Sequence, residues 1–188
     1  MKTLKLYFES LLDDDDVYLS KTDDVIIKKY IQDNYTITGN LIISKDRVVD
    51  CGGGVTVDNW FMTSLTNGLF RWGKIKSYFD CNGCNITSLE GSPKEVGGYF
   101  DCSYCNNLKT LEGAPEEVGG YFGCSNCVKL KTLKGAPKKV GGFFSCSSCG
   151  KLKSLEGAPE KICERLNCRY CDNLKITDSD RKKYKLIN

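Results

Sequence analysis

The sequence contains no histidine. This absence excludes the Ser-His-Asp and Cys-His nucleophile systems, the His-x-x-x-His zinc proteases and the usual general base near neutral pH. A Gly-x-x-x-x-Gly-Lys-Ser/Thr phosphate loop is also missing. The one run of three glycines, at 52–54, precedes a predicted strand at Val55–Val57, where such a loop needs a helix. We therefore expect no catalytic residues and no enzyme activity.

Long apolar runs are missing as well. No segment is long enough to span a bilayer, and Met1–Ser10 lacks the apolar centre and small-residue cleavage site of a signal peptide. The formal charge of +3 over 188 residues is too small to indicate a nucleic-acid partner. These features predict one domain that stays in the cytoplasm, where thiols remain reduced, and that makes no membrane contact.

Cysteine, in contrast, is abundant and regularly spaced. Ten of the twelve cysteines form the pairs Cys81/Cys84, Cys102/Cys105, Cys124/Cys127, Cys146/Cys149 and Cys168/Cys171. The first cysteines of successive pairs are separated by 21, 22, 22 and 22 residues (102−81, 124−102, 146−124, 168−146). A period of this length is typical of a solenoid, in which each repeat stacks on the next.

The residues around the pairs predict the type of solenoid. Each repeat follows VGGxFxCSxCxxLxxLxGxP, as in Val118–Pro137, which has the layout of a leucine-rich repeat. Phe122 and Cys124 are two apart, so on a strand they face the same side, which we expect to be the core. Leu130 and Leu133 are the expected core residues of the return arc. The predicted fold is an α/β solenoid: a leucine-rich-repeat arc with a parallel β-sheet on its concave face, an N-terminal helical and β cap, and a short C-terminal helix.

The paired cysteines fit three chemistries: a metal site, disulfides between neighbouring repeats, or reduced thiols in the core. A local match at a shift of 24 residues places Val57 and Trp60 where the next repeat has Cys81 and Cys84. A position that accepts Val or Trp is a packing position. We therefore predict buried, reduced thiols without metal and no cofactor, and keep a metal- or redox-active Cys-x-x-Cys module as the alternative.

The chain divides into four regions. They are an N-terminal helical cap at 1–34, a β cap merging into a degenerate first repeat at 35–72, regular repeats at 73–176 and a C-terminal cap at 177–188. In the first region, Leu4, Phe8 and Leu11 form one helical stripe, and Thr22 is a good helix start. The acidic run Asp13–Asp16 leaves open a docking segment for a basic partner. A short amphipathic helix is expected at Ser179–Leu186.

Several segments resemble a known family. They are Asn34–Ile37, Val48–Asp50, Gly73–Cys81 and units such as Leu111–Gly120. Over roughly residues 22–176 the chain resembles the short leucine-rich-repeat proteins encoded by large-genome tailed bacteriophages, although it carries Cys where many members have Asn at the turn position. The resemblance implies a repeat fold, a viral origin and action in the host cytoplasm. It implies little about activity, since fold does not determine function.

Stacked repeats turn equivalent positions into surface columns. The residue before each inward Phe forms the column Tyr78, Tyr99, Tyr121, Phe143 and Arg165. These residues are expected to face outward on the sheet, together with Asp101 and Tyr104, and to bind a protein partner. The alternative is that adjacent rings only stack on one another and stabilise the sheet by about 0.2–1 kcal/mol per pair.

Two kinds of charged column run along the repeats. Glu112, Lys134 and Glu156 alternate in sign, as do Glu116, Lys138 and Glu160, which favours local pairing between neighbouring repeats. The column Lys109, Lys131, Lys153 and Lys175 carries one sign only. It is a solvated face or, as the sharper hypothesis, an anion-binding site for a polyanion. The leading prediction remains a non-catalytic protein-binding module, with a host factor or defence component as its partner and an oligomeric state left open.

Overall fold

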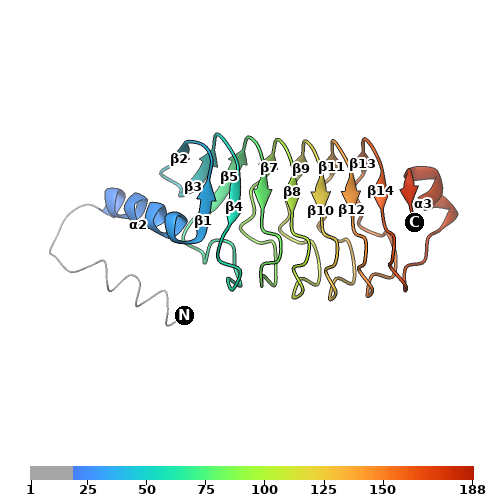
Figure 1. Cartoon of the computed structure of the whole chain (residues 1–188). Coiled ribbons are helices and arrows are strands. Elements are labelled where there is room, and N and C mark those ends of the chain that lie inside the picture. The colour runs from blue at the N-terminus through green and yellow to red at the C-terminus, as the bar shows by residue number, and fades with distance from the viewer. Residues whose placement is uncertain (1–18) are drawn as a thin grey trace.

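The computed structural model describes residues 19–188 as a rod of stacked rungs, a rung being one circuit of the chain. Helix α2 spans Leu19–Asn34, three residues earlier than expected, and lies at the N-terminal end of the rod (Figure 1). Its apolar face is buried in the same core as the first rung, and the Tyr30 ring meets Phe70 edge-on at 6.2 Å. The predicted stripe at residues 4–12 and the acidic run lie outside the described residues.

Two sheets run along the rod. The first, sheet A, contains, in spatial order, β1 (Tyr35–Ile37), β4 (Val55–Val57), β6 (Phe79–Asp80), β8 (Phe100–Asp101), β10 (Phe122–Gly123), β12 (Phe144–Ser145), β14 (Leu166–Asn167) and β15 (Leu186–Ile187). The second, sheet B, contains β13 (Lys161–Ile162), β11 (Lys139–Val140), β9 (Glu117–Val118), β7 (Glu95–Val96), β5 (Arg71–Ile75), β3 (Val48–Cys51) and β2 (Leu41–Ile43). Only the pairs β1–β4 and β2–β3 are antiparallel.

The solenoid is confirmed, but the helix-bearing arc is not what this structure shows. It is a β-solenoid of parallel strands, and the rungs stand in a nearly straight row (Figure 1). The segment expected to form the return arc carries a second strand in each rung, because Glu117 is exposed and Val118 is buried, as in a half-buried strand. Among residues 19–188 the helices lie only at the two ends.

The core consists of identical side chains stacked from rung to rung. Phe79, Phe100, Phe122 and Phe144 are fully buried, with ring centroids 5.3–5.5 Å apart and interplanar angles of 2–8°. This spacing is close to the roughly 4.8 Å between hydrogen-bonded strands. Leu130 and Leu133 are also fully buried, so the inward register predicted for the repeats is confirmed.

A glycine corner joins the two sheets. At Gly119 a Cβ atom would collide with the carbonyl oxygen of Gly97, and at Gly141 with that of Gly119. The rungs therefore approach one another closely here because no side chain intervenes. In the last rung, Cys163 and Glu164 replace the two glycines of this corner, and both are exposed.

The C-terminal end closes the rod differently from the prediction. Helix α3 (Asp178–Lys183) starts with a capping box between Thr177 and Asp180 but buries none of its residues, so it is not amphipathic. Closure comes instead from the segment after it. The Tyr184 hydroxyl donates to the Pro159 carbonyl at 3.0 Å, and β15 adds a parallel strand to β14.

Candidate functional site

All twelve cysteines are free thiols, and ten of them are buried. The second cysteine of a pair donates a hydrogen bond to the carbonyl of the first cysteine one rung earlier. Cys105 reaches Cys81 at 3.2 Å, Cys127 reaches Cys102 at 3.3 Å, Cys149 reaches Cys124 at 3.2 Å and Cys171 reaches Cys146 at 3.1 Å. This is the turn position at which leucine-rich repeats place Asn or Cys. The thiols thus serve as buried donors between rungs.

The environment of most of these thiols disfavours thiolate chemistry. The half-buried Cys171 is the exception, because its hydrogen bond with Cys146 lowers its pKa. Burial raises the pKa of Cys84 to about 12, that of Cys149 to about 12 and that of Cys168 to about 11. Since the thiolate is the nucleophile and the metal ligand, a raised pKa makes a thiol inert near neutral pH. No group of three or more His, Cys, Asp or Glu within the described residues could hold a metal ion.

The prediction that Val57 and Trp60 fill the packing positions of Cys81 and Cys84 is correct for Val57 only. Val57 follows the register of β4 on β6 to lie beside Cys81, and it is buried with 2% of its surface exposed. Trp60 is 67% exposed, so it does not fill a packing position as predicted. Its backbone still keeps the register, because the Asn85 N–H donates to the Trp60 carbonyl at 2.9 Å.

The aromatic column on sheet A is interrupted. Tyr78 and Tyr99 stack face to face, with centroids 4.9 Å apart and an interplanar angle of 4°, as the local-stacking alternative expects. Tyr121 instead lies over Gly123, where a Cβ atom would collide with its ring. Tyr78 and Tyr121 are half-buried, while Tyr99, Phe143 and Arg165 are exposed. The chain thus presents separate rings here and not a continuous ladder.

Asp101 has a local structural role. One carboxylate oxygen accepts from the Ser103 N–H at 2.9 Å, and the other accepts from the Asn82 side chain at 3.3 Å. Ser125 and Ser145 share a hydroxyl hydrogen bond at 2.8 Å, which continues the polar strip across sheet A. Because these polar groups already form hydrogen bonds with one another, the aromatic rings are the distinctive feature of this face.

A second row of apolar side chains stands where the strands of sheet A end. We call it the aromatic corner, and it comprises Trp60, Phe61, Tyr104, Val128 and Tyr170. Their exposed fractions run from 50% for Val128 to 89% for Phe61. Sequence reasoning identified only Tyr104 as a binding residue here, although Tyr170 stands at the equivalent position of its own Cys-x-x-Cys pair and could have been found by the same signal.

The backbone at this corner is unusual. Tyr104 has φ 58° and Tyr170 has φ 59°, in the left-handed region, at equivalent positions of their repeats. The same position is occupied by Gly83, Asn126 and Ser148, also with positive φ. Glycine and asparagine suit this conformation, whereas a bulky side chain is uncommon there.

The lysine column is in register. The Lys131 N–H donates to the Lys109 carbonyl at 3.1 Å, and the Lys175 N–H donates to the Lys153 carbonyl at 3.0 Å. All four side chains are exposed. The alternating columns also pair as predicted, with Lys134 Nζ 3.0 Å from Glu112 and Lys138 Nζ 3.7 Å from Glu116.

Comparison with known proteins adds no identification: no protein-family model, curated protein or solved structure matches the chain. Within the described part of the chain, no helix combines the length and apolar character needed to cross a membrane.

Proposed function

We propose that the chain is a non-catalytic protein-binding module that binds through sheet A and the aromatic corner. The observation that carries the proposal is the pair Tyr104 and Tyr170, which are 53% and 76% exposed and have left-handed backbones. An exposed ring gains little from packing, and the left-handed conformation costs a bulky residue about 1–2 kcal/mol. The repeated turn imposes this conformation on every equivalent residue, so the choice of tyrosine there, which the fold does not need, is what points to a function.

The distribution of apolar surface supports the same face. Nine large hydrophobic residues are exposed in the described part of the chain, and seven of them lie along the two edges of sheet A. They are Tyr99 and Phe143 at the edge where the strands begin, and the five residues of the aromatic corner at the edge where they end. Rings beside a polar, hydrogen-bonded strip match the composition of protein interfaces.

The partner we propose is a host protein in the host cytoplasm. This follows from the resemblance to the leucine-rich-repeat proteins of tailed bacteriophages. In the rungs, Cys127 and Cys149 donate to backbone carbonyls of the preceding rung at the position where the resemblance expects Asn or Cys. The proposed partner class is a host factor or defence component.

The test replaces each tyrosine by asparagine, which the chain carries at the equivalent position 126. Tyr104→Asn and Tyr170→Asn introduce the residue found at Asn126, so each should leave the fold intact and raise its stability by up to about 1 kcal/mol. Each should weaken capture of the partner by about 1–3 kcal/mol. Immobilised wild-type and variant proteins are compared for the partner they retain, with unfolding free energy measured alongside.

The matched control is Lys161→Asn, an exposed change on sheet B. It should alter neither quantity. A partner retained equally by wild type and by the Tyr104/Tyr170 double variant would show that binding lies elsewhere.

A second candidate function is polyanion binding by the lysine column. The column is flanked by the exposed Lys129 and Lys151, so six lysines share one face. Replacing Lys109, Lys131 and Lys153 by serine should then abolish binding to heparin or single-stranded DNA and reduce its salt dependence. The aromatic corner ranks first because no exposed ring interleaves with these lysines to stack on a base.

A further inference from the structure

A pocket of about 760 Å³ opens at the N-terminal part of the rod, outside β3 and β5. It results from an insertion. The register of β5 on β7 pairs Lys74 with Glu95, so Arg71 is equivalent to Ser92. Leu65 and Leu89 are the preceding buried leucines, which leaves 71−65 = 6 residues in the first rung against 92−89 = 3 in the next. The three extra residues form the wall of the pocket.

The inserted segment is an ordered loop. The Leu69 N–H donates to the Thr66 carbonyl at 3.0 Å, and Asn67 and Gly68 have positive φ, which gives a tight reversal. Leu69, Phe70 and Trp72 are buried and line the pocket, with the Phe70 and Trp72 rings edge-to-face at 5.1 Å. The pocket therefore has a rigid, partly aromatic lining.

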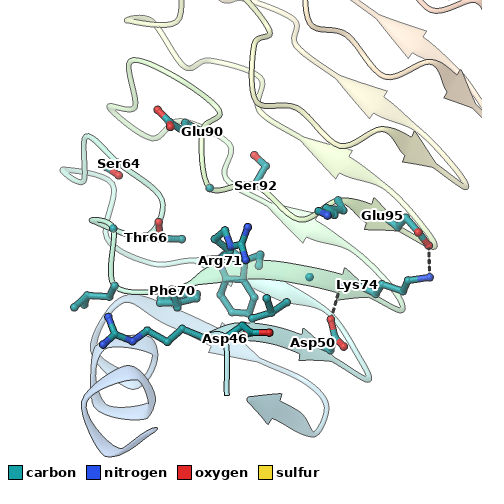
Figure 2. Close-up of a pocket in the computed structure, with 18 residues that line it drawn as sticks. Asp46, Asp50, Ser64, Thr66, Phe70, Arg71, Lys74, Glu90, Ser92 and Glu95 are labelled. Carbon is teal, nitrogen blue, oxygen red and sulfur yellow. Dashed lines mark hydrogen bonds and ion pairs between the residues drawn. The ribbon is translucent and has the colours of Figure 1, made fainter. Parts of the chain in front are cut away.

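Two cations that line the pocket, Arg71 and Lys94, have no side-chain partner among residues 19–188. The Arg71 side chain rises from β5 between Thr66 and Ser92 (Figure 2). Across residues 19–188 its guanidinium has neither a hydrogen bond nor an ion pair. In contrast, Lys74 Nζ lies 2.9 Å from Glu95, and Asp50 Oδ1 accepts from the Lys74 N–H at 2.6 Å. A guanidinium has five donors suited to a carboxylate, so Arg71 is the better of the two anchors for an anion.

A second polar group beside Arg71 is also unsatisfied. The Ser92 hydroxyl oxygen is buried and has no hydrogen-bond partner in the described part of the chain. An unpaired buried hydroxyl costs free energy, and the regular rungs avoid it by carrying Ala114, Ala136 and Ala158 at the equivalent position. A ligand held by Arg71 would satisfy this hydroxyl after a change of the Ser92 rotamer, because the oxygen is closed to solvent in the conformation shown.

The overall charge of the lining limits the number of negative charges that a ligand can carry. Four bases and four acids line the pocket: Arg47, Arg71, Lys74 and Lys94 against Asp46, Asp50, Glu90 and Glu95. A polyphosphate would meet four carboxylates, whereas a single negative charge needs only Arg71 and the hydroxyl. The buried apolar lining suits an uncharged flat group attached to that charge, and the volume lies in the range of small-molecule sites.

We propose that this pocket binds a monocarboxylate with a flat apolar body, the carboxylate on Arg71 and Ser92 and the body against Phe70. The acid can be a free small molecule or the C-terminal residue of a peptide. This site is separate from the aromatic corner and does not depend on the function proposed for it.

Tryptophan fluorescence provides a direct assay. The chain has two tryptophans, and Trp60→Phe leaves Trp72, which lines the pocket, as the single reporter. Titration of the full chain with 3-phenylpropanoate to millimolar concentrations should give a saturable change in Trp72 emission and a rise in Tm, because the ligand binds only the folded state. The neutral 3-phenylpropanamide should bind at least about tenfold more weakly.

Two variants test the anchors. Arg71→Gln should weaken 3-phenylpropanoate roughly 10- to 100-fold, the loss expected for a hydrogen bond to a charged group. Ser92→Ala should weaken it severalfold while leaving the Tm of the free protein unchanged or higher, because three regular rungs already carry alanine there. Lys161→Gln on sheet B, outside the pocket, should change neither value.

A third probe, a peptide ending in phenylalanine, distinguishes a peptide C-terminus from a free small acid as the source of the carboxylate. Tighter binding of the peptide than of the free acid assigns the site to a chain terminus, and the reverse assigns it to a small acid. Absence of a saturable response to both probes, equal binding of acid and amide, or full affinity in Arg71→Gln would each overturn the proposal.

Discussion

The regular rungs at residues 93–167 and the first rungs at residues 35–92 follow the same stacking rule but leave different surfaces. In the regular rungs each inward column repeats one residue type up to the last rung, where Leu166 and Ile162 replace Phe and Val. The interior is closed, so function can lie only on the outside. In the first rungs, three extra residues before Arg71 push a loop outward and open a pocket beside it. A repeat therefore gives surfaces in register, whereas a break in the repeat gives a cavity.

The largest effect should come from breaking the closed columns. Phe122→Ala removes the centre of the stacked phenylalanines and should cost about 3–5 kcal/mol of unfolding free energy, because the rigid rungs above and below cannot collapse into the cavity. Val55→Ala, at the register position of Phe79 in the first rung, should cost only about 1.5–3 kcal/mol. Urea denaturation of both variants measures the difference, and equal losses would contradict the distinction between the two regions.

The glycine corner should be the next most sensitive feature. Gly119→Ala places a methyl group against the Gly97 carbonyl and should cost about 1–3 kcal/mol through separation of the rungs. Gly150→Ala is the matched control in the regular region, because its Cβ meets nothing within 4 Å and its φ is not positive. That change should stabilise the protein by about 0.4–1 kcal/mol. Thermal unfolding of both variants shows whether the two substitutions change the stability in opposite directions.

Alkaline pH should weaken both regions, because each contains buried thiols. Burial raises the pKa of Cys84 and Cys149 from 9.0 to about 12. Below pH 9 the thiols are protonated in both states and stability is unaffected. Between pH 9 and about 12 the unfolded chain releases protons that the folded chain retains, so stability falls by up to about 1.4 kcal/mol per pH unit for each thiol.

The measurement is urea denaturation under reducing conditions at about pH 8 and about pH 10. Replacing Cys84 and Cys149 by valine should make the decline with pH shallower than in the wild type. The same decline in both proteins would mean that other groups, such as lysines and tyrosines, are responsible.

The smallest effect should come from the alternating charges. Lys134→Gln breaks the exposed pair with Glu112 and should change the unfolding free energy by no more than about 0.5 kcal/mol, an effect lost at high salt. A larger, salt-resistant loss would mean that the charge columns hold the rungs together.

Spacing in the sequence was sufficient for the core of the regular rungs. Phe122 and Cys124 point inward because alternate residues of a strand share a face, and the 22-residue period aligns them with their equivalents. The second strand at Glu117–Val118 was missed because two residues carry almost no periodic signal. Trp60 was misplaced because a match of backbone register does not determine the direction of a side chain.

The repeat length, the stacked inward columns and the alignment of the lysines follow from the amino-acid sequence, because a constant period constrains every rung equally. Which outward groups remain available depends on the folded arrangement. Tyr121 folds over Gly123 while Tyr104 stays exposed, and Arg71 stands unpaired beside Ser92 while Lys74 pairs with Glu95. The pairing of Lys74 and the position of Arg71 depend on residues 21 positions away in the chain, Glu95 and Ser92, which they meet only when the rungs stack.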